Sequence, residues 1–157
     1  RYSSSAASDV YKRQAMTHEH SPAENAELSN GNPVERLPRV LIVDDDPDII
    51  ESIRFALKSK EVEVLIARDG NQGLAMAEKE EPDLVILDMM MPKRSGFLVL
   101  EQLRQTSLRP MRFIMITANE GNRHKQYAET LGVDDYIQKP FPMDRLLGSV
   151  ERLLRLG

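Results

Sequence analysis

The sequence contains no cysteine. Disulfide bonds, thiolate metal sites and a cysteine nucleophile are therefore excluded, and the absence fits a reducing cytoplasm. No apolar run approaches the roughly 20 residues that cross a bilayer, and the N-terminus lacks the charged-then-apolar pattern of a secretory signal peptide. We therefore predict a soluble cytoplasmic protein that does not interact with a membrane.

The chain also has little excess of one charge sign over the other. The net charge is only −4 in 157 residues, and acidic and basic side chains are interspersed along the chain. Proteins that bind nucleic acid through its phosphates usually concentrate basic residues on one face, so we expect no direct contact with nucleic acid. The length is sufficient for one domain with a single core.

The first 38 residues are rich in Ser, Ala, Asn, Glu and Pro and have no apolar periodicity. Such a segment cannot bury enough apolar surface to offset its loss of conformational entropy, so we predict that residues 1–38 are disordered. Residues 1–14 begin without Met and look like a translated cloning or sequencing scar, which makes Met16 the expected natural start. The folded domain is expected at residues 39–157.

Short apolar runs alternate with stretches of helical periodicity in the rest of the chain. The runs, which predict strands buried on both faces, are residues 39–43, 62–67, 84–87, 112–116 and 133–137. The helical stretches are residues 47–60, 70–79, 95–105, 120–131 and 143–156. Alternating strands and helices predict a parallel sheet with helices on both faces. In such folds ligands bind beyond the carboxyl ends of the strands, where the strand order reverses.

Polar residues follow four of the five predicted strands. They are Asp44, Asp45 and Asp46 after the first, Asp88 after the third, Thr117 after the fourth and Lys139 after the fifth. Any one of them could simply end a strand or cap a helix. Their combination is much less expected by chance, because the carboxyl ends of parallel strands converge at one edge of the sheet.

Converging carboxylates repel one another and need a proton or a cation to coexist. Oxygen ligands favour a hard ion such as Mg²⁺ over zinc or copper. A carboxylate at such a site can act as a nucleophile and form an acyl phosphate. Lys139 can supply a second positive charge, and Thr117 can donate a hydrogen bond to the phosphoryl group. The residues therefore predict a site for phosphoryl transfer.

Four motifs occur in order along the predicted domain: VLIVDDDPDI, LVILDMMMP, FIMITA and GVDDYIQKPF. With these motifs, residues 39–156 resemble the receiver domains of two-component response regulators. The resemblance implies a doubly wound, flavodoxin-like α/β fold with five parallel strands in the order 2-1-3-4-5. It also implies a phosphorylation switch in a two-component phosphorelay.

The resemblance assigns the phosphoryl group to Asp88 and places a Mg²⁺ ion beside it. Asp45 is the expected direct ligand, and Asp44 is expected to act largely through water. The backbone carbonyl of Met90 is expected to complete the protein's share of the metal shell, which a Met side chain does not prevent.

Further roles follow from the same resemblance. Thr117 and Lys139 are expected to contact the phosphoryl group. Tyr136 is the expected switch residue, because in receivers this aromatic side chain rotates inward when the hydroxyl residue moves toward the phosphate. The peptide bond between Lys139 and Pro140 is expected to be cis, which would aim the Lys139 side chain inward.

Three positions depart from the commonest receiver pattern. Ser95 stands before Gly96 where many receivers have Asp, but that Asp is not a metal ligand in the family, so the chemistry should be unaffected. Met90 and Asn119 occupy the two variable positions thought to tune the lifetime of the acyl phosphate. Neither is a strong base, so we assign no dephosphorylation catalyst to them.

Other functions compete with this interpretation. A phosphatase that passes through an aspartyl phosphate would need a carboxylate two residues after Asp88, where this chain has Met90. A dinucleotide-binding module would need a glycine fingerprint after the first strand, where this chain has acids that would repel a pyrophosphate. A receiver-like protein that is never phosphorylated is disfavoured by the complete set of site residues. We expect a switch that catalyses only its own phosphorylation and dephosphorylation.

The resemblance implies a sensor histidine kinase or a phosphotransfer protein as the phosphoryl donor. The expected docking surface for a downstream protein is the fourth helix, fifth strand and fifth helix, which flank Tyr136 and could also form a homodimer. Two interpretations of the chain remain open: a stand-alone receiver and a piece of a longer regulator.

Overall fold

The computed structural model describes residues 35–118 and 120–157. Within it, Leu37–Gly157 form one compact unit. The predictions of a scar at residues 1–14 and of disorder up to residue 34 lie outside the described residues, as does Asn119. No helix in the described part of the chain combines the length and apolar character required to span a membrane.

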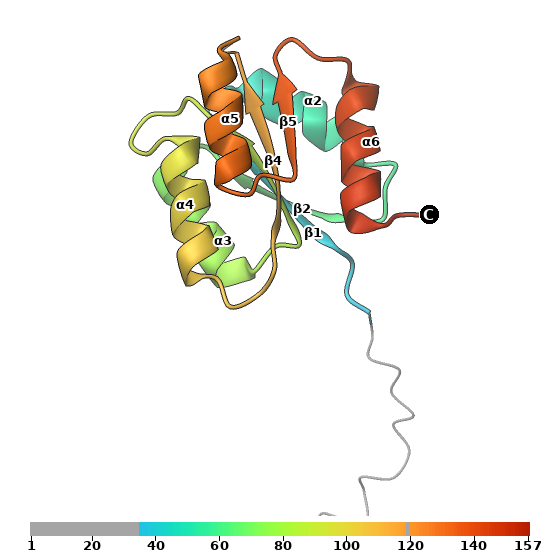
Figure 1. Ribbon diagram of the computed structural model, residues 1–157. Helices are drawn as coiled ribbons and strands as arrows, with labels where there is room; N and C mark the ends of the chain where they lie inside the picture. The colour runs from blue at the N-terminus through green and yellow to red at the C-terminus, as the bar shows by residue number, and fades with distance from the viewer. Residues whose placement is uncertain (1–34, 119) are drawn as a thin grey trace, which may run out of the picture. The chain divides into compact units, whose positions relative to one another are not determined.

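The five strands form one parallel sheet in the order β2-β1-β3-β4-β5 (Figure 1). Their bounds are β1 (Arg39–Val43), β2 (Glu63–Ala67), β3 (Leu84–Asp88), β4 (Arg112–Thr117) and β5 (Asp135–Gln138). The predicted α/β fold and strand order are therefore confirmed. The order reverses between β1 and β3, which pair in parallel with Val43 opposite Leu87. The residues that follow Val43 and Leu87 consequently lie beside each other at the switch point.

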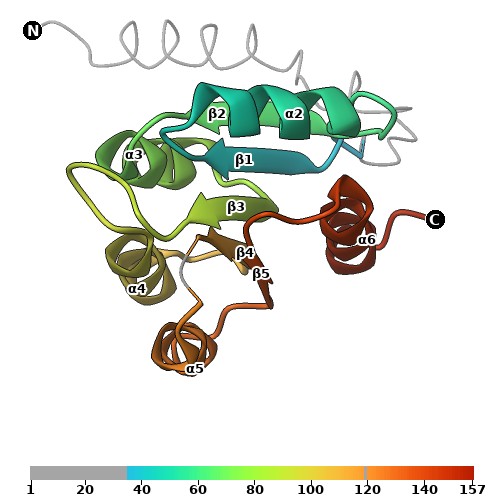
Figure 2. The ribbon, with the colours of Figure 1, turned by 90° about the horizontal axis from the view of Figure 1, so that it is seen from above.

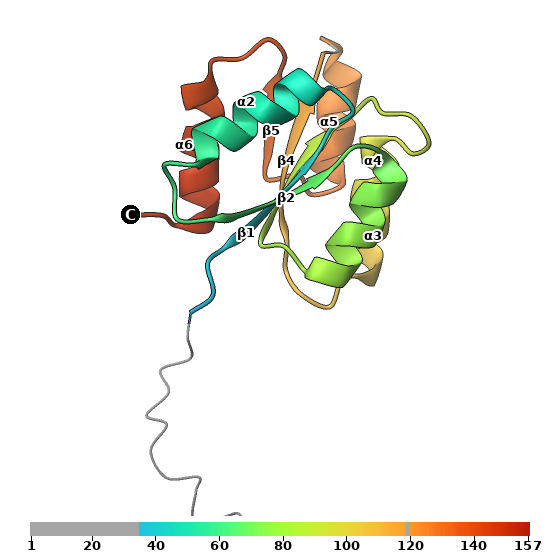
Figure 3. The ribbon, with the colours of Figure 1, turned by 180° about the vertical axis from the view of Figure 1, so that it is seen from behind.

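Helices cover both faces of the sheet, as predicted. They are α2 (Pro47–Leu57), α3 (Gly70–Glu80), α4 (Gly96–Thr106), α5 (Asn122–Thr130) and α6 (Met143–Leu154). Figure 2 shows α2 and α6 on one side of the sheet and α3, α4 and α5 on the other. From behind, α2 and α6 lie next to each other (Figure 3).

The two layers of the core follow from the alternation of side chains along the strands. In β1, Leu41 and Val43 join the cluster that α3 and α4 cover, whereas Val40 and Ile42 join the cluster under α2 and α6. All four side chains are fully buried. This double burial explains why the strand is apolar throughout instead of alternating with polar residues.

Side-chain caps fix the starts of three helices on the site's edge of the sheet. Asp46 accepts a hydrogen bond from the Asp48 N–H at 2.9 Å before α2, and Asp69 accepts one from the Gln72 N–H at 2.8 Å before α3. Ser95 is the N-cap of α4. The helix expected at residue 120 instead begins at Asn122, after a Gly121 cap that has no side chain to hold it.

Candidate functional site

Three acidic side chains meet where the strand order reverses. Asp88 is the last residue of β3, and Asp44 and Asp45 follow β1 directly. One carboxylate oxygen from each lies within 4.8 Å of the other two. Asp44 and Asp88 are buried, with 0% and 4% of their surfaces exposed, whereas Asp45 is exposed. The strand register therefore brings together the three carboxylates predicted as metal ligands.

Lys139 reaches this cluster from the loop between β5 and α6. Its Nζ atom lies 3.0 Å from Asp44 Oδ2 and 3.5 Å from Asp88 Oδ1. The Lys139 N–H donates to the Thr117 carbonyl at 2.7 Å, which attaches the loop to the end of β4. The peptide bond from Lys139 to Pro140 is cis, as the resemblance implied.

The electrostatic environment perturbs the central groups. Burial raises the pKa of the Asp88 carboxyl and the neighbouring Asp44 adds to this, whereas Lys139 and the Met90 N–H lower it; together these effects bring the pKa to about 6. Burial alone would lower the pKa of Lys139, but its contacts with Asp44 and Asp88 outweigh burial and raise it. Three carboxylates thus face one ammonium group, an arrangement that would gain from a further cation.

Replacing Asp88 with Asn should raise the free energy of unfolding near pH 7 in metal-free buffer, by an amount on the order of 2–3 kcal/mol. Because the folded-state pKa of about 6 lies above the ordinary aspartate pKa of 3.8, the native protein retains a proton between these two pH values that the unfolded chain has lost. The stability of wild type therefore falls as the pH rises from 3.8 to about 6. The amide of the variant does not titrate, so the variant avoids this loss.

Urea unfolding of wild type and Asp88→Asn in EDTA, at about pH 4 and about pH 7, measures this difference. The variant should exceed wild type in unfolding free energy only slightly at about pH 4, and by the full expected amount at about pH 7. An equal difference in stability at both values would contradict the raised pKa.

Thr117 and Tyr136, the two residues assigned to the switch, lie on the neighbouring strands β4 and β5. Thr117 ends β4, is fully buried, and its hydroxyl donates to the sulfur of Met89 at 3.6 Å, a weak acceptor. The Tyr136 hydroxyl is buried and has no hydrogen-bond partner of ordinary geometry among the described residues. Burial raises the pKa of Tyr136. The neighbouring Thr117 hydroxyl lowers this pKa by a smaller amount, through a contact outside ordinary hydrogen-bond geometry.

Met90 follows the cluster on the loop toward α4. Its N–H donates to Asp88 Oδ1 at 3.4 Å, and its side chain is 66% exposed. The position two residues after Asp88 therefore presents a thioether to solvent and directs its backbone N–H toward Asp88.

The structure also shows roles that the sequence did not reveal. Asp46, the third acid of the run, caps α2 and is not part of the carboxylate cluster. Ser95 caps α4 by accepting from the Leu98 N–H at 3.4 Å. Both Ser and Asp are good N-caps, so the departure from the commonest receiver pattern preserves this function. The sequence feature that indicates both caps is an acidic or hydroxyl residue directly before a helical stretch.

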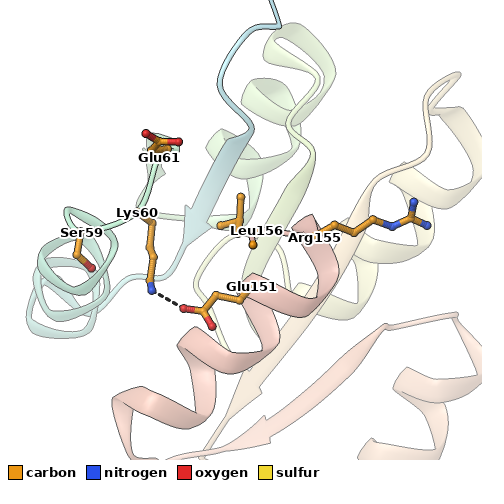
Figure 4. A pocket seen from close by; sticks show the side chains of 7 residues that line it. Ser59, Lys60, Glu61, Glu151, Arg155 and Leu156 are labelled. Carbon is orange, nitrogen blue, oxygen red and sulfur yellow. Dashed lines mark hydrogen bonds and ion pairs between the residues drawn. The ribbon is translucent and has the colours of Figure 1, made fainter.

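A separate hollow lies at the amino-terminal end of the strands, between the ends of α2 and α6 (Figure 4). Lys60 and Glu151 form an ion pair across it. The lining side chains labelled in Figure 4 include both charge signs: Ser59, Lys60, Glu61, Glu151, Arg155 and Leu156. Lys60 and Glu151 neutralise each other there, and the carboxylate cluster lies at the opposite edge of the sheet.

Comparison with known proteins identifies the family. Residues 40–151 match the model of the response regulator receiver domain. The chain belongs to this family. The receiver domain is 38% identical, over 117 residues, to the alkaline phosphatase synthesis transcriptional regulatory protein PhoP of Bacillus subtilis. It is also 38% identical, over 120 residues, to the DNA-binding dual master transcriptional regulator RpaA of Synechocystis.

These matches cover 74% and 76% of this chain but only 48% and 50% of the two regulators, so the chain spans about half the length of the curated relatives it matches. Among solved structures, the receiver domain is similar to a CheY-like response regulator receiver domain protein from Methanospirillum hungatei. The TM-score is 0.70 at 36% identity, and the match covers 76% of this chain and 95% of the other.

Proposed function

We propose that this receiver domain accepts a phosphoryl group on Asp88 from a sensor histidine kinase or a phosphotransfer protein. The observation that carries the proposal is the arrangement around Asp88. A buried carboxylate lies 3.5 Å from the Lys139 ammonium, and the oxygens of Asp44 and Asp45 lie within 4.8 Å of it. Receiver domains generally bind Mg²⁺ at an acidic cluster, and this oxygen-only donor set fits that ion.

In the proposed reaction, an Asp88 carboxylate oxygen forms a bond to phosphorus as the bond from phosphorus to the donor nitrogen breaks. The donor keeps the electron pair of the broken bond, and Asp88 becomes an acyl phosphate. Lys139, held by Asp44, is placed to donate to a phosphoryl oxygen. Thr117 can donate to a second one by leaving its weak sulfur acceptor.

Asp44, Asp45, Asp88 and the backbone carbonyl of Met90 are the groups that we propose to hold Mg²⁺. When bound, the ion offsets the charge of the carboxylates and of the incoming phosphoryl oxygens. Met90 offers no carboxylate to activate a water for rapid turnover. We therefore propose a switch that catalyses only its own phosphorylation and dephosphorylation, and is not a turnover enzyme.

The proposed output surface consists of α5, β5 and α6. A hollow beside Tyr136 on this surface is lined by Glu120, Gly121, Asn122, Lys125 and Gln138. Asp135 of β5 binds Arg145 of α6 through two contacts of 2.7 and 2.8 Å. Arg145 and the nearby Ser149 lower the pKa of Asp135 to about 2, against the effect of burial. Strand and helix are thus tied together, so movement of Tyr136 can alter one continuous surface for a downstream protein or a second copy.

A small phosphoryl donor tests the proposal without knowledge of the partner kinase. The chain is incubated with acetyl phosphate and Mg²⁺ and examined by intact-protein mass spectrometry. We expect the mass of one phosphoryl group to be added, to depend on Mg²⁺, and to be lost in base. A chain that gains no base-labile phosphate would contradict the proposed function. We place this reaction in the cytoplasm, in agreement with the cysteine-free sequence.

A further inference from the structure

The loop of residues 89–95 connects β3 to α4 and touches α3 where there is no space for a side chain. A Cβ atom on Gly70, the first residue of α3, would lie 2.0 Å from the Arg94 carbonyl oxygen and 2.7 Å from its carbonyl carbon. Both are backbone atoms, so a methyl group at Gly70 can be accommodated only if the loop or the helix moves. This approach sets the distance between the loop and α3.

The Arg94 side chain fastens the same point of the loop to two helices. Its Nε atom donates to Asn71 Oδ1 on α3 at 3.0 Å, and Nη1 donates to Gln102 Oε1 on α4 at 2.9 Å. The Arg94 N–H donates to the Pro92 carbonyl at 2.8 Å, which closes a tight turn in the loop. Arg94 therefore holds the loop by its backbone and by its planar guanidinium group.

The remainder of the loop is attached to the acidic cluster. The Met90 N–H contacts Asp88 Oδ1 at 3.4 Å, and the Gly96 N–H donates to the Met89 carbonyl at 2.9 Å. A Cβ atom on Gly96 would lie 2.2 Å from the Asp88 carbonyl oxygen, so this end of the loop is also closely packed. These contacts connect Arg94 to the backbone at Met90 through a short, closely packed loop.

We propose that Gly70 and Arg94 are positioning residues for the Mg²⁺ site, acting through the loop that carries Met90. The inference rests on the proposed function, because it assumes that the Met90 carbonyl joins Asp44, Asp45 and Asp88 around the ion. Mg²⁺ requires near-octahedral geometry at about 2.0–2.1 Å and tolerates little displacement of a ligand. The start of α3, which contributes no ligand, thereby sets the affinity of the site.

Titration with Mg²⁺ alone tests this inference. Binding to the full chain is followed by the amide NMR shifts of residues around the site, and the melting temperature is measured without the ion. Gly70→Ala and Arg94→Ala should each raise the Kd for Mg²⁺ about tenfold, as is usual when a group that orients a metal ligand is removed. For Arg94→Ala, the melting temperature of the ion-free protein should change little.

Two matched controls accompany these variants. Gly148→Ala makes the same change in α6, where an added Cβ meets nothing within 4 Å. Arg54→Ala removes an exposed arginine that pairs with Glu51 on α2, away from the loop. Neither control should change the Kd for Mg²⁺.

The possible outcomes separate the inference from the proposed function. If the wild type shows no saturable Mg²⁺ binding, the proposed function fails and the inference fails with it. If the wild type binds Mg²⁺ and both variants bind it equally well, the inference alone is overturned. The same holds if the variants lose melting temperature but their folded fraction keeps the wild-type Kd. If Gly70→Ala does not fold, Arg94→Ala, a partly exposed side chain, decides the question.

Discussion

Asp88→Asn should reduce phosphorylation of the chain by acetyl phosphate and Mg²⁺ by at least about a hundredfold, because the amide lacks an anionic nucleophilic oxygen. Asn has nearly the same shape as Asp, so the packing of this buried residue should be preserved. The variant is also expected to be more stable than wild type near neutral pH, since burial holds the pKa of the Asp88 carboxyl at about 6. Loss of labelling could not then be attributed to unfolding.

Asp46→Asn is the matched control for this experiment. Asp46 adjoins the cluster in sequence, is exposed, and caps α2 through the Asp48 N–H. Asn is an equally good N-cap, so this variant should keep both its fold and its labelling. Intact-protein mass spectrometry over a time course measures all three proteins. If Asp88→Asn is labelled as strongly as wild type, the phosphoryl group is on another residue and the site assignment is wrong.

Asp45→Ala should weaken Mg²⁺ binding and Asp46→Ala should lower stability, although the two residues are adjacent. Asp45 contributes an oxygen to the carboxylate cluster, so its removal should raise the Kd for Mg²⁺ about tenfold or more. It is exposed in the ion-free protein, so stability without the ion should change little. Asp46→Ala removes a helix cap and should cost about 1 kcal/mol of unfolding free energy while the Kd stays near the wild-type value.

Mg²⁺ titration and urea unfolding of the three proteins provide the two measurements. Comparable losses of Mg²⁺ affinity in both variants would show that Asp46 also serves the ion, and the ligand assignment would be wrong. A loss of stability in Asp45→Ala as large as that in Asp46→Ala would instead indicate that Asp45 has a structural role.

Much of the fold could be predicted from local pattern. Runs such as that of residues 39–43 are apolar throughout because both faces of the sheet are covered, and this regularity is visible in the sequence. The ends of the elements were less predictable. Strands β3 and β4 each extend one residue beyond the predicted run, to include Asp88 and Thr117. Polar residues can continue a strand when a neighbouring strand supplies hydrogen bonds, and a single sequence does not show those bonds.

The same distinction between sequence and tertiary structure applies to the candidate site. The sequence by itself determined which residue types are available at the carboxyl ends of the strands: three acids after the first strand, Asp88, Thr117 and Lys139. Only the tertiary structure decided which of them meet. Asp45 joins the cluster and Asp46 turns away to cap a helix, although both are exposed acids in one run.

The physical reason is that packing contacts act between residues far apart in the chain. Lys139 and Asp44 lie 95 positions apart and approach to 3.0 Å only because strand pairing places the carboxyl ends of β1 and β5 at the same edge of one sheet. The contact of Gly70 with Arg94 likewise depends on the distance between a helix and a loop. Sequence periodicity records which side of a strand or helix is buried, and the folded chain alone sets the distances on which an ion site depends.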